Sequence, residues 1–121
     1  MRRKIHIVAV TACVSGVAHT YMAADRLRHI VRQYAFDLQV ETQGAFGIDN
    51  PLPEEAIAAA DLVVICADID IEGIERFEGC RRLTCPISIL LNTPENVMEE
   101  IHRLLVQPQG SCFALSLSAG R

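Results

Sequence analysis

Two short apolar runs constrain the fold of this 121-residue chain more than any other feature. Ile5–Val10 is apolar at five of its six positions, with His6 the exception, and Leu62–Ala67 is apolar throughout. Runs of this length, rich in β-branched residues, are typical of strands buried on both faces of a parallel sheet. Because parallel strands need long crossover connections, we expect helices between them and therefore an α/β fold.

The remaining segments supply those helices and further strands. Phe36–Glu41 alternates apolar and polar residues and predicts a second strand near an edge, and Arg81–Thr84 predicts a fourth strand at an edge. Apolar residues recur at helical spacing along three segments, Val17–Tyr34, Pro53–Ala60 and Pro94–Leu105, the last capped by Asn92 or Thr93. The sequence thus predicts a single doubly wound domain, with a central parallel sheet of about four strands flanked by helices.

Three segments fit no long element. Thr42–Pro51 is unusually long for a connection in a compact domain, which suggests a function, and Asp68–Gly79 predicts a loop with one helical turn. Residues 107–121 are rich in Gly, Ser and Pro and predict a weakly held tail, so that the domain proper spans residues 1–106.

Composition excludes several classes of protein. The net charge of -4 and the absence of a Lys/Arg stripe argue against nucleic-acid binding. No apolar run approaches the ~20 residues of a membrane span, and no signal peptide is recognisable, so we expect a cytoplasmic protein without membrane insertion. The five cysteines form no C-x-x-C pair and predict reduced thiols rather than a metal site, and nothing calls for a cofactor.

Cys13 stands where the first apolar run gives way to the first predicted helix. Ligands of open α/β sheets bind beyond the carboxyl ends of the strands, and the unpaired N–H groups of a helix N-terminus favour a tetrahedral oxyanion there. The same field favours a thiolate over a thiol, so Cys13 could accept a phosphoryl group and pass it on. Ser15, His19 and Thr20 add side-chain donors close by, while Gly16 lets the backbone fold around a small anion.

Other interpretations of this turn remain open. A cysteine at the end of an apolar strand is commonly a packing residue, and a nucleotide or another anion could use the same amides. The spacing from Cys13 to His19 and Thr20 is that of the C-x5-R-[ST] loop of low-molecular-weight tyrosine phosphatases, but His19 replaces the arginine. Without that bidentate clamp, and without an evident Asp general acid, a carrier of phosphate fits better than a hydrolase.

Three longer blocks carry a resemblance to a known family. The chain reads VAVTACVSGVAHTYMAAD, then VETQGAFGIDN, then IAAADLVVICADIDIEGIERFEG, and over residues 4–85 it resembles the fructose-type enzyme IIB domains of the bacterial phosphoenolpyruvate-dependent sugar phosphotransferase system. The resemblance implies a phosphotransferase in which Cys13 is the phosphocysteine. It would be loaded from a phosphohistidine of a IIA partner and unloaded onto fructose or a fructose-like sugar held by the membrane permease IIC.

The resemblance also assigns the neighbouring residues. Thr11, Gly16, His19 and Thr20 match the family's loop, whereas Val14 and Ser15 stand where the family usually has Pro and Thr. We therefore expect the phosphoryl-binding loop to be Val14, Ser15, Gly16, Val17, Ala18, His19 and Thr20. Thr11, Thr42, Gln43 and Gly44 are candidates for contact with the phosphoryl group or a partner, although Gly44 could simply mark a turn with positive φ.

The rim of the site could bind partners. Val14, Val17, Ala45 and Phe46 are apolar loop residues that could be exposed for docking, unless Phe46 packs inward. Phe77 is assigned to the core, and Arg76 has no assigned role. The alternatives to a phosphocarrier are a low-activity cysteine phosphatase and a non-catalytic regulatory module that binds an anion.

Overall fold

The computed structural model describes residues 4–13 and 17–116, which form a six-stranded sheet in the order β3-β2-β1-β4-β5-β6. All strand pairs are parallel except the antiparallel pair β2–β3. The strands are β1 (His6–Ala12), β2 (Asp37–Gly44), β3 (Gly47–Asp49), β4 (Leu62–Ala67), β5 (Arg82–Cys85) and β6 (Cys112–Ala114). The helices are α1 (Val17–Arg32), α2 (Glu54–Ala59), the 3₁₀ turn η1 (Ile74–Phe77), α3 (Ile87–Asn92) and α4 (Pro94–Leu105).

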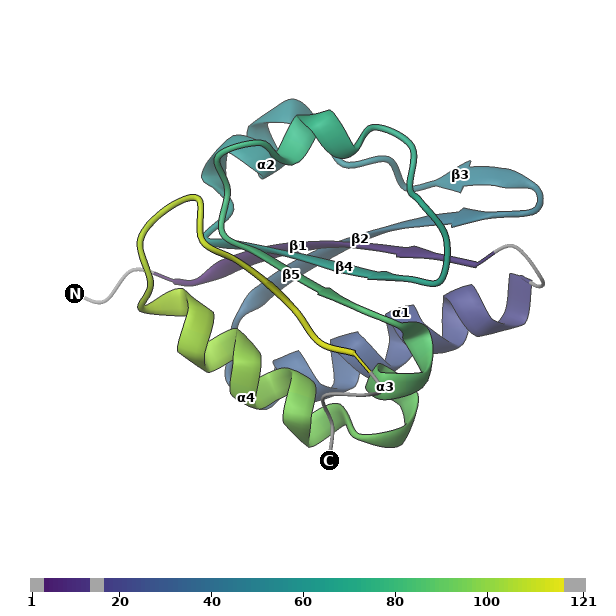
Figure 1. Cartoon of the computed structure of the whole chain (residues 1–121). Helices are drawn as coiled ribbons and strands as arrows, with labels where there is room; N and C mark the ends of the chain where they lie inside the picture. The colour runs from purple at the N-terminus through teal and green to yellow at the C-terminus, as the bar shows by residue number, and fades with distance from the viewer. Residues whose placement is uncertain (1–3, 14–16, 117–121) are drawn as a thin grey trace.

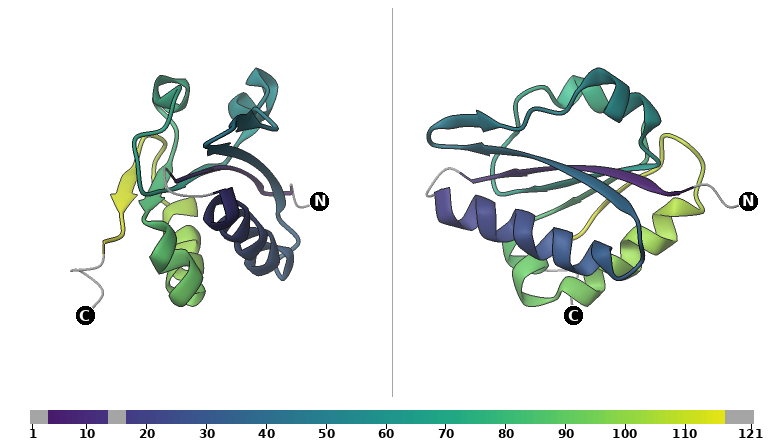
Figure 2. Two further views of the ribbon diagram at one scale, coloured as in Figure 1. Left: turned by 90° about the vertical axis from the view of Figure 1, so that its right-hand side faces the viewer. Right: turned by 180° about the vertical axis from the view of Figure 1, so that it is seen from behind.

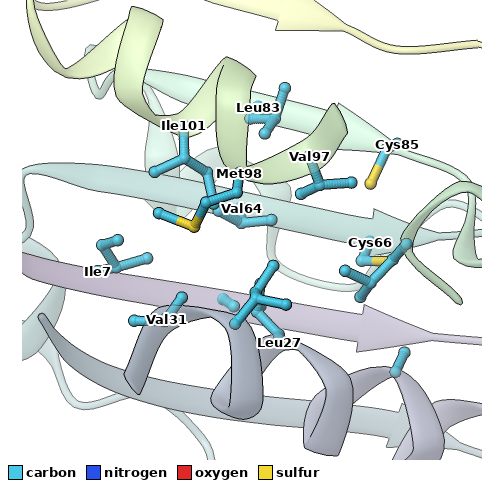
Figure 3. Close-up of a cluster of buried hydrophobic side chains, with 14 of the residues drawn as sticks. Ile7, Leu27, Val31, Val64, Cys66, Leu83, Cys85, Val97, Met98 and Ile101 are labelled. Carbon is cyan, nitrogen blue, oxygen red and sulfur yellow. The ribbon is translucent and has the colours of Figure 1, made fainter. Parts of the chain in front are cut away.

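The sheet separates two helical layers (Figure 1). Helices α1, α3 and α4 cover one face, and α2 with η1 covers the other, as the two further views confirm (Figure 2). Alternate residues of the central strands supply the two cores. Ile7, Val64 and Leu83 pack beneath α1 and α4, where Leu27 and Ile101 meet them (Figure 3).

The second core lies on the α2 side of the sheet. It contains Val8, Val10, Val63, Ile65 and Phe77, all buried. The prediction that Phe77 belongs to the core is therefore confirmed. Both faces of β1 and β4 are covered, which explains why their sequences are almost continuously apolar.

The expected α/β architecture is confirmed, but the sheet has more strands than the expected four. The predicted loop Thr42–Pro51 contains the end of β2 and all of β3, which form a hairpin around Ala45 and Phe46. β2 is therefore second from the edge of the sheet, as expected of a strand near an edge. The alternation in its first half reflects partial exposure of β2 itself, since Asp37 and Leu38 are half-buried and Gln39 is exposed.

The expectation that β5 lies at an edge is wrong. β6 pairs with it in parallel, held by hydrogen bonds from Arg82 N to Ser111 O (2.9 Å) and from Leu115 N to Thr84 O (2.8 Å). Phe113 and Leu115 pack against the core under α4. The segment from residue 107, expected as a weakly held tail, thus contributes the strand β6 and packs against the core as far as Leu115.

Helix ends follow local chemistry. α1 ends at Arg32, two residues before the predicted end, where the chain turns to a positive φ at Ala35. The predictions missed α3 entirely. Thr93 precedes α4 but does not cap it, because its hydroxyl donates instead to Ile89 O (2.9 Å) in α3.

Candidate active site around Cys13

Cys13 directly follows β1 and is almost fully buried, with 4% of its surface exposed. The carboxyl ends of β1, β2 and β4 meet at this edge of the sheet, since Ala12 is in register with both Gln43 and Ala67. Asp68 N donates to Ala12 O (3.1 Å), which anchors the residue before Cys13 to the end of β4. The described part of the chain thus places Cys13 where open α/β sheets bind ligands, as predicted.

Helix α1 begins four residues later, at Val17. Its first turn contains no acidic residue, so no carboxylate of that turn offsets the positive end of the helix dipole. Ala18 and His19 are exposed, whereas Thr20 is buried. Val14, Ser15, Gly16 and the side chain of Val17, which we predicted to bind the phosphoryl group, lie outside the described part of the structure.

Thr11 fixes the helix to the strand. Its hydroxyl donates to Thr20 O at 3.1 Å within the core. In register it lies between Thr42 of β2 and Cys66 of β4. Because side chains alternate along strands, Thr11, Thr42, Cys66 and Cys13 all belong to the face of the sheet covered by α1.

Gln43 lies on the opposite face and is engaged there. Its amide nitrogen donates to Glu41 Oε2 (2.8 Å) and to Glu72 O (3.0 Å), and its amide oxygen accepts from Glu72 N (2.9 Å). Both amide protons are therefore in use. The amide protons of Gln43 are thus engaged within the protein, whereas Thr42 lies on the same face as Cys13. Contact of Gln43 with the phosphoryl group or a partner stays a prediction.

Gly44 is a strand residue, and it does not mark the turn. It pairs with Gly47 in the β2–β3 hairpin, and it is Gly47 that has the positive φ, at 114°. A Cβ at Gly44 would meet nothing within 4 Å. The interpretation of Gly44 as a turn that requires positive φ is therefore wrong.

A buried ion pair supports β2 from the α2 side. Glu41 has no exposed surface, and Arg76 binds both of its oxygens, through Nη1 (2.8 Å) and Nη2 (3.0 Å). Leu52 N donates to the same carboxylate (2.9 Å). Burial alone pulls the pKa of Glu41 upward, but the hydrogen bonds from Arg76, Leu52 and Gln43 outweigh it and hold the pKa below its ordinary value. The hydrogen bond with Glu41 in turn raises the pKa of Arg76.

The β2–β3 hairpin is joined to α1 through a tyrosine. The Tyr21 hydroxyl donates to Asp49 Oδ2, and this hydrogen bond raises the pKa of Tyr21. At the hairpin tip Phe46 has 91% of its surface exposed, so the alternative in which it packs inward is wrong. Ala45 is exposed beside it, as predicted.

The other cysteines differ from Cys13 in their surroundings. Cys66 and Cys85 are buried in register on β4 and β5 (Figure 3). Hydrogen bonding with Cys85 and burial raise the pKa of the Cys66 thiol far above its ordinary value, which makes it a packing residue.

The described residues contain neither a cluster of metal ligands nor a membrane-spanning helix. No group of three or more His, Cys, Asp or Glu side chains there could hold a metal ion. None of the described helices is long and apolar enough to cross a membrane.

The sequence interpretation missed three contributors to this region. Asp68, at the carboxyl end of β4, also accepts from Ile87 N (3.1 Å) at the start of α3, and the rule for ligand sites at strand ends could have identified it. The Glu41–Arg76 pair and the Tyr21–Asp49 hydrogen bond join residues distant in the sequence, and no local sequence pattern predicts either.

Comparisons with known proteins agree with this geometry. The family model described as "PTS system, Lactose/Cellobiose specific IIB subunit" matches residues 8–100. The "PTS system fructose-like EIIB component 3" of Escherichia coli K12 is 47% identical over 104 residues, covering 86% of this chain and 92% of that protein. The crystal structure titled "Predicted Fructose Specific IIB from Escherichia Coli" superimposes with a TM-score of 0.88 at 45% identity, covering 92% of this chain and 98% of that one.

One relative is much longer than this chain and is similar to it over only part of its length. The chain is 38% identical over 94 residues to the "PTS system fructose-specific EIIABC component" of Bacillus subtilis 168, covering 78% of this chain but 15% of that protein. The name of that relative joins A, B and C components in one polypeptide. The chain described here belongs to the IIB family of the sugar phosphotransferase system, and within that family to the fructose-type IIB components.

Proposed function

We propose that the protein is a phosphocarrier that uses Cys13 as its phosphorylated residue. The Cys13 thiolate attacks the phosphorus of a phosphohistidine on a IIA partner, so that an S–P bond forms while the P–N bond breaks. The leaving imidazole takes up a proton from solvent. A sugar hydroxyl bound by the IIC permease then attacks the same phosphorus. The S–P bond breaks, the thiolate is regenerated and the hydroxyl proton passes to solvent.

One observation carries the proposal: Cys13 lies at the carboxyl end of β1, before a helix whose first turn contains no acid. Backbone N–H groups at such a terminus stabilise both a thiolate and the negative charge of a transferring phosphoryl group. We assign phosphoryl binding to the loop from Val14 to Thr20. The histidine at position 19 cannot reproduce the bidentate clamp of a hydrolase arginine, which supports transfer over hydrolysis.

Partners and sugar follow from the family. We propose a IIA phosphohistidine protein as donor and a IIC permease as acceptor, with no nucleic acid and no insertion of this chain into the membrane. Fructose or a fructose-like sugar is the proposed substrate, on the basis of the relatives' names. The exposed hairpin tip at Ala45 and Phe46 is the proposed docking rim. We place the protein in the cytoplasm, since its five cysteines are odd in number and form no C-x-x-C pair, as fits reduced thiols.

Intact-mass spectrometry after incubation with phosphorylated IIA tests the proposal. Wild-type protein should gain one phosphoryl group, and Cys13→Ser should gain none that is labile to iodine, which cleaves S–P bonds. Cys112→Ser is the matched control, because Cys112 is exposed and distant from the site, and it should label like the wild type.

Equal labelling of wild type and Cys13→Ser would reject Cys13 as the acceptor. Rapid turnover of an aryl phosphate, without a persistent adduct, would instead establish a cysteine phosphatase. Anion binding with neither labelling nor turnover would establish a regulatory module.

A further inference from the structure

Two buried hydroxyl groups close to Cys13 have no hydrogen-bond partner. They belong to Thr20, which is 1% exposed, and Thr42, which is 3% exposed. Among the described residues, no other buried side-chain oxygen or nitrogen atom lacks a hydrogen-bond partner. An unpaired buried hydroxyl costs about 1–3 kcal/mol, so two in one small region require an explanation.

Both residues adjoin Thr11, two positions before Cys13. Thr42 is directly opposite Thr11 in the register of β1 and β2, and the Thr11 hydroxyl donates to Thr20 O. Thr42 and Cys13 are on the same face of the sheet, and Thr20 lies in the first turn of the helix that covers this face. The two unsatisfied hydroxyls therefore come from different elements and lie beneath the same helix N-terminus.

The neighbouring hydroxyl groups already donate their protons to other acceptors. The Thr11 proton goes to Thr20 O, and the Tyr21 proton goes to Asp49. The hydrogen bond to Asp49 raises the pKa of Tyr21, and the Thr42 hydroxyl, which faces the Tyr21 oxygen, acts against that rise; this contact does not have the geometry of a full hydrogen bond. In the unphosphorylated protein, the hydroxyl protons of both threonines thus remain available to another acceptor.

We propose that Thr20 and Thr42 donate these hydroxyls to the oxygens of the phosphoryl group carried on Cys13. The inference rests on the proposed function and extends it, because Thr42 belongs to β2 and not to the loop that follows the cysteine. A dianionic phosphoryl group accepts several hydrogen bonds, and bonds to charged acceptors are about twice as strong as neutral ones. The hydroxyls are unsatisfied in the resting protein and become satisfied in the phosphorylated one.

Thr42→Val and Thr20→Val test the proposal, since valine keeps the shape and removes the hydroxyl. Thermal unfolding is followed in inorganic phosphate and in sodium chloride of equal ionic strength. We expect phosphate to raise the Tm of the wild type, and we expect each variant to bind phosphate about tenfold more weakly or worse. Thr84→Val, a partly buried threonine on the other face of the sheet, should respond like the wild type.

The resting proteins provide a second readout. Without phosphate, Thr42→Val should unfold at or above the wild-type temperature, because it loses an unsatisfied group. Thr11→Val should unfold at a lower temperature, because it loses an existing hydrogen bond. If Thr42→Val is destabilised as much as Thr11→Val, the hydroxyl is bonded in the resting protein and the proposal is wrong.

The phosphocysteine itself decides between bound and free phosphate. We expect the equilibrium constant for transfer from phosphorylated IIA to fall about tenfold in Thr42→Val. If Thr42→Val loses the Tm shift in phosphate but keeps the wild-type equilibrium for phosphoryl transfer, the hydroxyls bind free phosphate only and the proposal is wrong. Unchanged phosphate binding in the variants would also overturn the proposal. If Cys13 accepts no phosphoryl group, the function fails separately, and the phosphate titration alone tests the two hydroxyls.

Discussion

Removal of Arg76 should expose how strongly the buried ion pair stabilises the strand beside Cys13. Glu41 is fully buried and accepts four hydrogen bonds, two from Arg76 and one each from Gln43 and Leu52. Arg76→Met keeps an unbranched side chain but removes the guanidinium, which also lies over the Phe77 ring, and leaves the carboxylate with two of its four donors. An uncompensated charge then remains in the interior.

Removal of one partner of a buried ion pair costs about 3–5 kcal/mol. The Arg76 side chain is 28% exposed, so water can partly replace it, and we expect a loss near the lower limit, about 3 kcal/mol. Domains of this kind have about 5–15 kcal/mol of stability in total. The variant should therefore fold but unfold at much lower urea concentration.

The pH dependence of this loss has a definite sign. In the wild type the pKa of Glu41 is below its ordinary value, so the pair stabilises the fold above the unfolded-state pKa of about 4.3 and loses this effect as the pH falls through the folded-state pKa. In Arg76→Met burial should dominate and raise the pKa of Glu41. Protonation of Glu41 then removes the uncompensated buried charge in the variant. The difference in free energy of unfolding between variant and wild type should therefore shrink as the pH falls from neutral to below about 4.3.

Urea unfolding at several pH values measures both effects. Arg28→Met is the matched control, because Arg28 pairs with Asp25 at 3.0 Å on the surface and should contribute less than about 1 kcal/mol. The double variant Glu41→Gln/Arg76→Met should recover at least about 1 kcal/mol relative to Arg76→Met, since the charge is gone. A loss below about 1 kcal/mol at neutral pH, or a difference that grows as the pH falls, would refute the reasoning.

Three further predictions concern other parts of the molecule. Phe46→Ser should change the free energy of unfolding by no more than about 0.5 kcal/mol, because Phe46 is 91% exposed, yet it should raise the IIA concentration needed for half-maximal transfer; an unchanged requirement would remove Phe46 from the docking rim. Leu83→Ala, in the core of β5, should cost about 2–5 kcal/mol in urea unfolding, whereas a loss below about 1 kcal/mol would contradict its burial. A chain ending at Val106 loses β6 and the packing of Phe113, and its Tm should fall; an equal Tm would restore the interpretation of this segment as a weakly held tail.

The accuracy of the fold prediction depended on burial. β4 was predicted with its observed bounds because both of its faces are covered, which leaves an apolar run with clear limits. β3 and β6 have three residues each and mostly exposed or half-buried side chains, so neither has a hydrophobic pattern to read. β3 is joined to β2 by a tight turn at Ala45 and Phe46, whereas β6 pairs with β5, from which α3 and α4 separate it along the chain. The pairing of β6 makes β5, the strand expected at an edge, an internal strand.

The position of Cys13 is readable from local sequence, because a strand end, a turn and a helix start are adjacent along the chain and define the site locally. The residues that surround Cys13 depend instead on how the strands and helices pack together. Thr42 and Gln43 are neighbours in sequence, but strand alternation sends Thr42 to the face of Cys13 and Gln43 to the Glu41–Arg76 pair on the other face. Those contacts join segments about 30 residues apart, and their energy comes from desolvation and geometry that exist only once the sheet and its helices have packed.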